Sequence, residues 1–424
     1  MSAVRLMLYA GGMRARAAIG LAASLVALSS SAGAQTQVRG FATAAVGVTD
    51  NATFALAGTT RTTSATAEVR PGVAMLLDEK RDHHVLGYAL RLSWVAAAEG
   101  QQTYSNQVFW RWLHEATPRD NLTFEATATQ GKTSPFYLAA TTPGAPLAGA
   151  TPNVIRFATG RVRETWTRAL APSWTMSQSL GASIYAPLDD DAAIARTTAA
   201  DALLYLERSF RRSAVRLETG ATYVVYGDLT TGGAARPGDR EVLGMTMARY
   251  RRDLSPTWQT EVAAGASIVA SVSRSTSPVV GPLASAALRR LFEDGSLSFT
   301  AMHSTTTNIY LAQTAVVDEA SVAAVIPVDR RRRVRLVGNA AYGLSHNVLA
   351  GAAVGDSRYR YYRVDGGVLY IVSNGVRVSG HVTRLDETAD ASTASTAPSF
   401  SVDTALIDIT VVWPPPDSVA GAPF

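Results

Sequence analysis

The sequence predicts an all-β protein, a single transmembrane antiparallel up-and-down β-barrel of about eighteen strands, with sixteen as the alternative count. Three observations predict it. Polar and apolar residues alternate with period two along many segments, short polar turns alternate with longer loops, and tryptophans gather beside the short turns.

Residues 1–34 are expected to be a secretory signal peptide. Arg5, Arg14 and Arg16 precede an apolar run, Ala17–Leu28, and the small residues of Ala32–Ala34 form an A-x-A-type cleavage site. The apolar run is too short to cross a bilayer, although an amphipathic N-terminal helix is an alternative. The predicted organisation is therefore a signal peptide at 1–34, a barrel at 35–413 and a short tail at 414–424.

The composition restricts the partners. The chain has no cysteine, which is normal for an exported barrel closed by its own hydrogen bonds. Its net charge is +5, and removal of the three signal-peptide arginines leaves +2. This small net positive charge does not favour the binding of a polyanion, so nucleic acid is not expected as a partner. Outer-membrane lipid is expected as a partner, and the predicted location is the outer membrane of a Gram-negative cell.

Strict alternation is clearest in five segments, namely Leu122–Thr129, Trp258–Ser271, Ser296–Ala301, Val376–Thr383 and Thr404–Trp413. In each, one face is apolar and the other carries hydroxyl, amide or charged groups, as in a strand between lipid and a lumen. Two segments resist assignment. In Val154–Ala169 either choice of face turns charge toward lipid, and in Glu241–Arg251 two methionines share a face with two arginines.

The connections alternate in length. The short turns are expected at Asp78–His84, Pro118–Asp120, Ala171–Ser173, Arg211–Ser213, Asp253–Thr257, Glu293–Gly295, Asp329–Arg333 and Ser373–Gly375. The longer loops include Gly131–Asn153, Leu188–Arg196, Gly227–Asp239 and Asp386–Pro398. Eight short turns and nine longer loops give eighteen strands, with both termini on the short-turn side. That side is periplasmic in barrels of this design.

Large aromatics lie close to the short turns or to the end of the last strand. They are Trp112, Trp166, Trp174, Trp258, Trp413, Phe210 and Phe292. An aromatic belt at a membrane–water boundary has this distribution, whereas a soluble β-sandwich would hold its aromatics at mid-strand.

The polar face gives the candidate pore-lining charges. The cations are Arg70, Arg91, Arg111, Arg216, Arg289, Arg335, Arg363 and Arg377. The anions are Glu68, Glu115, Glu125, Asp201, Glu207, Glu218, Glu261, Glu319, Asp365 and Asp408. A mixed-sign wall suits neutral or weakly charged polar solutes, including sugars; alternatively, the charges pair with each other and only hold the barrel's shape. A barrel this wide leaves an aqueous lumen or holds a plug, and Gly131–Asn153 is the longest loop that could fold inward.

No catalytic or cofactor motif is present. The six histidines lack the spacing of a metal site, so no metal, no cofactor and no enzymatic activity are expected. A cross-strand Ser/His or Asp/His arrangement stays open, as does an adhesin function of the outer loops. Asp189–Asp191 could bind a divalent cation but is better explained as a solvated charge run.

The basic run of Arg330, Arg331, Arg332 and Arg333 lies on a short turn, hence on the expected periplasmic side. It could contact lipid phosphates, dock an acidic periplasmic partner, or be an exposed turn with no partner.

In size, strand count, lack of an added domain and an Ala/Arg/Thr-rich composition, the mature chain resembles the eighteen-stranded outer-membrane barrels of polysaccharide export described in myxobacteria. The resemblance implies a conduit for a secreted or capsular polysaccharide that works with a separate periplasmic polysaccharide-export protein. It transfers no site residue, because no diagnostic motif carries it. General porins for small hydrophilic solutes share the strand number and are the alternative.

Overall fold

The structure, a computed structural model, describes residues 35–51, 60–96, 102–133, 154–189, 195–231, 234–236, 238–273, 276–308, 313–348, 358–389 and 399–414. The strands are β1 (Gln35–Thr49), β2 (Ser64–Asp78), β3 (Asp82–Val95), β4 (Thr103–Thr117), β5 (Asp120–Thr133), β6 (Ile155–Ala171), β7 (Trp174–Pro187), β8 (Thr197–Ser209), β9 (Ser213–Tyr226), β10 (Leu229–Thr231), β11 (Ala234–Arg236), β12 (Asp239–Asp253), β13 (Trp258–Ser271), β14 (Val279–Phe292), β15 (Gly295–Asn308), β16 (Gln313–Pro327), β17 (Val334–Asn347), β18 (Arg358–Ser373), β19 (Val376–Ala389) and β20 (Phe400–Trp413).

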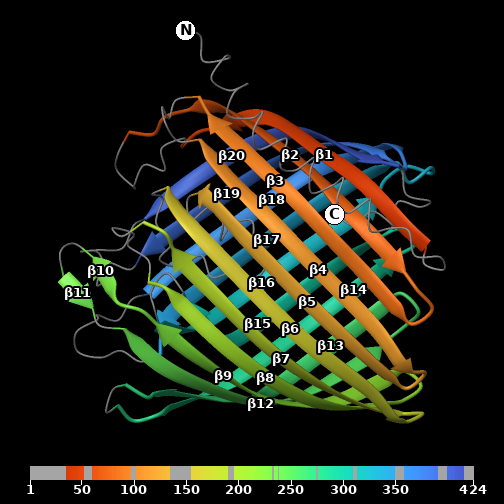
Figure 1. The fold of residues 1–424 in the computed structure, drawn as a ribbon, viewed down its shortest axis with the longest axis vertical. Helices are drawn as coiled ribbons and strands as arrows, with labels where there is room; N and C mark the ends of the chain where they lie inside the picture. Colours follow the sequence, from red (N-terminus) through yellow and green to blue (C-terminus); the bar gives the residue numbers. More distant parts are fainter. Residues whose placement is uncertain are drawn as a thin grey trace.

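Eighteen strands of the described chain form one antiparallel sheet that closes on itself (Figure 1). β1 pairs with β2 on one side and with β20 on the other, so the sheet has no free edge. The predicted fold class and strand count are therefore confirmed. None of the described residues belongs to a helix long and apolar enough to cross a membrane.

The connections follow the predicted alternation. Eight short turns join strand pairs at one end of the barrel, the short-turn end, where β1 also begins and β20 also ends. The other end, the long-loop end, carries the nine longer connections of the described strand order. The loop between β9 and β12 holds a small hairpin, β10–β11, which projects beside the barrel in Figure 1. The greater part of Gly131–Asn153, the proposed inward loop, lies outside the described residues.

The inner face is identified by contacts that skip a strand. Arg163 on β6 reaches Asp201 on β8 with 3.0 Å between a guanidinium nitrogen and a carboxylate oxygen, although β7 lies between them. Such a contact requires the concave side of the sheet. The opposite, convex side carries exposed aliphatic side chains, among them Leu180, Val262 and Ile268. This polarity is that of a barrel surrounded by hydrocarbon.

Register resolves both ambiguous segments. On β6, Arg161 and Arg163 face inward and Glu164 faces outward, because Arg163 pairs with the inward Asp201 of β8. On β12, Met245 and Met247 lie on the inner face with Arg249 and Arg251. Arg249 bonds there to inward carboxylates of both neighbouring strands.

Two hairpins carry the same aromatic anchor at the short-turn end. On β7–β8 the Arg208 guanidinium carbon lies 5.4 Å from the Trp174 ring centroid and 5.1 Å from that of Phe210. On β13–β14, Arg290 lies 5.5 Å from Trp258 and 5.1 Å from Phe292. Register turns Trp174, Arg208, Trp258, Arg290 and Phe292 outward.

Candidate solute path along the inner wall

Register places all eighteen candidate pore-lining charges on the inner face. They are Glu68, Arg70, Arg91, Arg111, Glu115, Glu125, Asp201, Glu207, Arg216, Glu218, Glu261, Arg289, Glu319, Arg335, Arg363, Asp365, Arg377 and Asp408. The structure brings many of them together in pairs, while Arg289 stands apart from these pairs among the described contacts.

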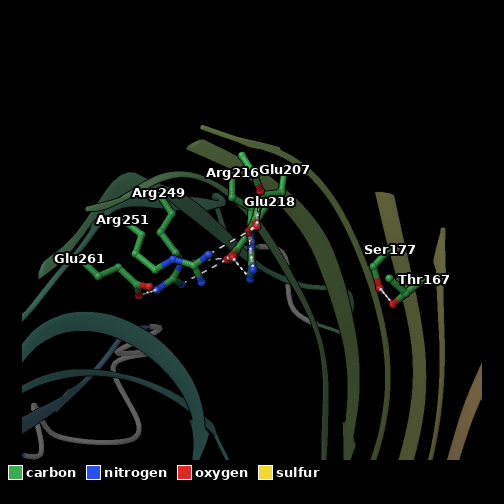
Figure 2. Close-up of polar contacts among 9 residues, drawn as sticks. Thr167, Ser177, Glu207, Arg216, Glu218, Arg249, Arg251 and Glu261 are labelled. Atoms are coloured by element: carbon green, nitrogen blue, oxygen red, sulfur yellow. Dashed lines mark hydrogen bonds and ion pairs between the residues drawn. The ribbon is translucent and has the colours of Figure 1, made fainter. Parts of the chain in front are cut away.

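The largest charged group is a ladder that runs from β8 to β13 (Figure 2). Arg216 on β9 lies 2.6 Å from Glu207 on β8 and 3.4 Å from Glu218 on its own strand. Arg249 on β12 contacts Glu218 at 3.1 Å and also bonds to Glu261 on β13. The ladder therefore alternates in sign along four adjacent strands.

Burial strengthens the ion pairs at the centre of this ladder. The Glu218 side chain is 10 % exposed, and two arginines neutralise it. Removing one partner of such a group leaves an uncompensated charge in a poorly solvated place, which is costly. Arg251, at 3.8 Å from Glu207, adds a second cation beside the first anion of the ladder.

A second pair depends on a glycine. Arg163 on β6 and Asp201 on β8 lie 3.0 Å apart across the intervening β7. The strand between them has Gly181 at this level, and a Cβ there would lie 2.4 Å from an Asp201 carboxylate oxygen. Only glycine lets the carboxylate lie over the strand and reach the guanidinium.

The remaining inner charges form smaller groups. Glu68 accepts hydrogen bonds from Arg70 at 2.8 Å and Arg91 at 2.6 Å. Arg111 and Glu125 lie 3.4 Å apart and are more than half exposed. Elsewhere on the wall, Asp365 accepts a hydrogen bond from Thr383 at 2.7 Å, and Asp408 accepts one from Ser379.

Hydroxyl groups line the wall beside the ladder. Thr167 donates to Ser177 at 3.1 Å and Thr165 donates to Ser179 at 3.2 Å, both across β6 and β7. Figure 2 shows the first pair on strands next to the charged ladder. Paired ions and hydroxyls together give a polar wall with charges of both signs.

The wall is drawn inward at the long-loop end. β14 and β15 pair only from Ala284–His303 down to their shared turn. Above that level, Thr314 at the start of β16 donates its backbone N–H to a Glu241 carboxylate oxygen on β12 at 3.0 Å, and its hydroxyl donates to the same oxygen. Val224 and Tyr226 are buried on the inner side nearby. These contacts narrow the lumen at this end.

Several residues of this wall escape sequence reasoning. Arg249 and Arg163 lie in the two segments whose faces alternation leaves ambiguous, and Glu241 bonds to a residue 73 positions away. The one sequence signal for the first two is that an arginine at mid-strand in a barrel must face inward or meet a carboxylate.

The four arginines of the basic turn fall into two groups, one paired with carboxylates of this chain and three exposed. Arg332, at φ 56°, contacts Glu293 and Asp294 of the neighbouring short turn, the latter at 3.1 Å. Hydrogen bonding to these carboxylates raises the pKa of the Arg332 guanidinium. Arg330, Arg331 and Arg333 are exposed, and no contact of theirs to an acidic group occurs among the described residues. Thus the chain itself neutralises one of the four charges.

The described residues hold no cluster of three or more histidine or carboxylate groups placed to bind a metal ion. Histidines pair with single carboxylates, as His303 does with Asp318 at 2.6 Å on the outer face.

The chain is similar to several solved outer-membrane proteins at low sequence identity. No family model and no curated protein matches the sequence. Among solved structures, the chain is similar to OmpT, an outer membrane protein of Vibrio cholerae, in a comparison that covers 91% of this chain and 99% of that one at 12% identity and TM-score 0.39. It is similar to OccAB3 of Acinetobacter baumannii over 89% and 100% of the chains, at 8% identity and TM-score 0.45. It is also similar to the siderophore receptor PirA of that organism over 89% and 81%, at 7% identity and TM-score 0.47.

Proposed function

We propose that the protein is an outer-membrane channel through which small hydrophilic solutes diffuse. The observation that carries the proposal is the contrast between the two faces of the closed sheet. Aliphatic and aromatic side chains are exposed outside, and ion pairs and hydroxyls cover the inside. In this proposal the short-turn end is periplasmic, as in other barrels with short turns at one end.

The inner wall favours weak selectivity. Because most of its charges are paired with an opposite charge, no single sign dominates the field along the path. Hydroxyls and exposed ion pairs exchange hydrogen bonds with passing water and sugars at little cost. The narrowing beside Glu241 sets the upper size of the solute in this account.

Liposome swelling tests the proposal. Vesicles that contain the purified barrel should swell in isotonic arabinose and glucose, more slowly in a disaccharide, and hardly in a large dextran. Vesicles prepared with heat-unfolded protein are the control. No swelling in any small sugar would exclude a diffusion channel.

A second candidate function is export of a polysaccharide with the help of a periplasmic export protein. The observation in its favour is the exposed group Arg330, Arg331 and Arg333 at the short-turn end, which could dock an acidic partner. Replacing these three by serine, and leaving the internally paired Arg332, should then reduce surface polymer while the barrel stays folded. Surface polymer at the wild-type level after deletion of the whole gene would exclude export and leave the diffusion channel.

A further inference from the structure

Glu164 is an acidic side chain in an unexpected place. It faces outward at the middle of β6, and its direct neighbours in the sheet are Phe124 on β5 and Leu180 on β7. The side chain is exposed, and none of the described residues gives it a hydrogen bond or an ion pair. In hydrocarbon an isolated carboxylate at this depth is unfavourable.

A donor lies beside it at the same height. From one strand to the next, the directly paired residue lies closer to the long-loop end of the barrel. The series of direct partners that starts at Arg91 in β3 ends at Phe157, near the long-loop end of β6. A horizontal line from Glu164 therefore meets β7 about one residue below its direct partner Leu180. The nearest outward residue there is Gln178, which is also exposed.

We propose that a second copy of this chain packs against the outer face of β6 and β7, across a two-fold axis along the membrane normal. Two copies inserted in the same direction can be related only by an axis of that orientation, and it brings residues of equal height together. Glu164 of each copy then accepts a hydrogen bond from the Gln178 amide of the other. The inference rests on the proposed membrane-spanning barrel.

The rest of this face is self-complementary in the same way. By the same rule of equal height, Val162 meets Leu180 of the second copy, and both side chains are exposed in one barrel, at 43% and 52%. Toward the long-loop end, the outward residues Gly160 and Ala182 are small and let the two sheets approach closely. A different protein would need its own donor at this depth, whereas a second copy supplies it by symmetry.

Because the chain has no cysteine, single cysteines can test this face. Leu180→Cys should be joined into a dimer by a short bis-maleimide in outer membranes and in detergent. Ala264→Cys is the matched control, because it lies outward on β13 six residues beyond Trp258, as Leu180 lies six beyond Trp174. It should remain monomeric.

Gln178→Leu tests the hydrogen bond. It removes both symmetric donors and should raise the dimer dissociation constant on the order of 100-fold, about tenfold for each hydrogen bond to a charged group. Sugar permeation into liposomes serves as the independent readout of the folded channel and should be unchanged. Equal cross-linking of Leu180→Cys and Ala264→Cys, or a dissociation constant unaffected by Gln178→Leu, would overturn the proposed dimer. Absence of sugar permeation with the unmodified protein would instead count against the proposed channel.

Discussion

Two strand pairs, β6–β7 and β13–β14, differ on their outer faces although their short-turn ends are alike. β7 and β13 both begin with an outward tryptophan that stacks with an arginine of the next strand. Above this anchor, β13–β14 presents only small or aliphatic groups such as Val262, Ile268 and Val280. At the same depth β6–β7 presents Glu164 and Gln178. The shared anchor marks a common membrane boundary, so the difference above it concerns what covers each face.

Between the two strand pairs lies the inner ion-pair ladder, where we expect the largest effect of a single substitution. Glu218→Ala leaves Arg216 and Arg249 without their shared partner and should reduce the free energy of unfolding by about 3 kcal/mol. The measurement is urea unfolding in detergent micelles. The control is Glu125→Ala, whose pair with Arg111 is more than half exposed and should contribute less than about 1 kcal/mol. Equal losses would mean that the ladder is as solvated as that pair.

A cation on the aliphatic face should have the next largest effect. Ile268→Arg places a charge in hydrocarbon and should cost about 2–4 kcal/mol of assembly if the site lies near the midplane. Glu164→Leu on the other face should leave the yield of folded barrel unchanged or higher. Heat-modifiability on gels reports the folded fraction. Normal assembly of Ile268→Arg would show that this face does not meet lipid.

The aromatic anchors should contribute similarly in both hairpins. Arg208→Gln and Arg290→Gln each remove an exposed cation–π contact, which should cost about 0.5–1 kcal/mol. The midpoints of urea unfolding of the two variants should therefore move together. A clear difference would indicate that one anchor is covered by something other than lipid headgroups.

The long-loop end of β6–β7 should show a small pH dependence. The Asp189 carboxylate accepts hydrogen bonds from the backbone N–H and side chain of Arg156, both at 2.6 Å, and this lowers its pKa. A carboxyl group whose pKa is lowered by folding stabilises the contact above its ordinary pKa, and this contribution is lost as the pH falls through the lowered value. Proteolysis near Asp189 should therefore increase at low pH in the wild type and be pH-independent in Asp189→Asn. Identical profiles would show that the carboxylate does not hold this loop.

Much of the fold could be predicted from the sequence because each barrel strand faces lipid on one side and the lumen on the other, so apolar and polar residues alternate with period two. The outer faces of β13 and β20 are apolar along most of their length and their inner faces carry the polar groups, and the turn lengths fix the strand count. The apolar exceptions on the inner side include Ala263, Val269, Leu406 and Val412. The face of β6 could not be predicted, because both of its faces carry charge. Arg163 has a partner on the inner face because Asp201, 38 residues away, lies over Gly181 and reaches it.

The sequence predicts which residues lie on the inner face along the candidate path, but not which of them form ion pairs or hydrogen bonds with one another. Parity alone selects residues such as Glu68, Glu218 and Asp408 for the inner face. That Glu218 meets Arg249 depends on the register of β9 against β12 across the loop that holds β10 and β11. The contact of Glu241 with Thr314 depends on where β14 and β15 separate, which leaves no periodic mark in the sequence.

The most direct test of a channel lined by this inner face uses two adjacent residues of β4 in planar bilayers. Gln107 faces the lumen and Val108 faces outward, and both are exposed. The purified barrel should conduct ions with little preference for cation or anion. A charged methanethiosulfonate should reduce the conductance of Gln107→Cys and leave that of Val108→Cys unchanged. Absence of conductance, or equal sensitivity of the two variants, would contradict this account.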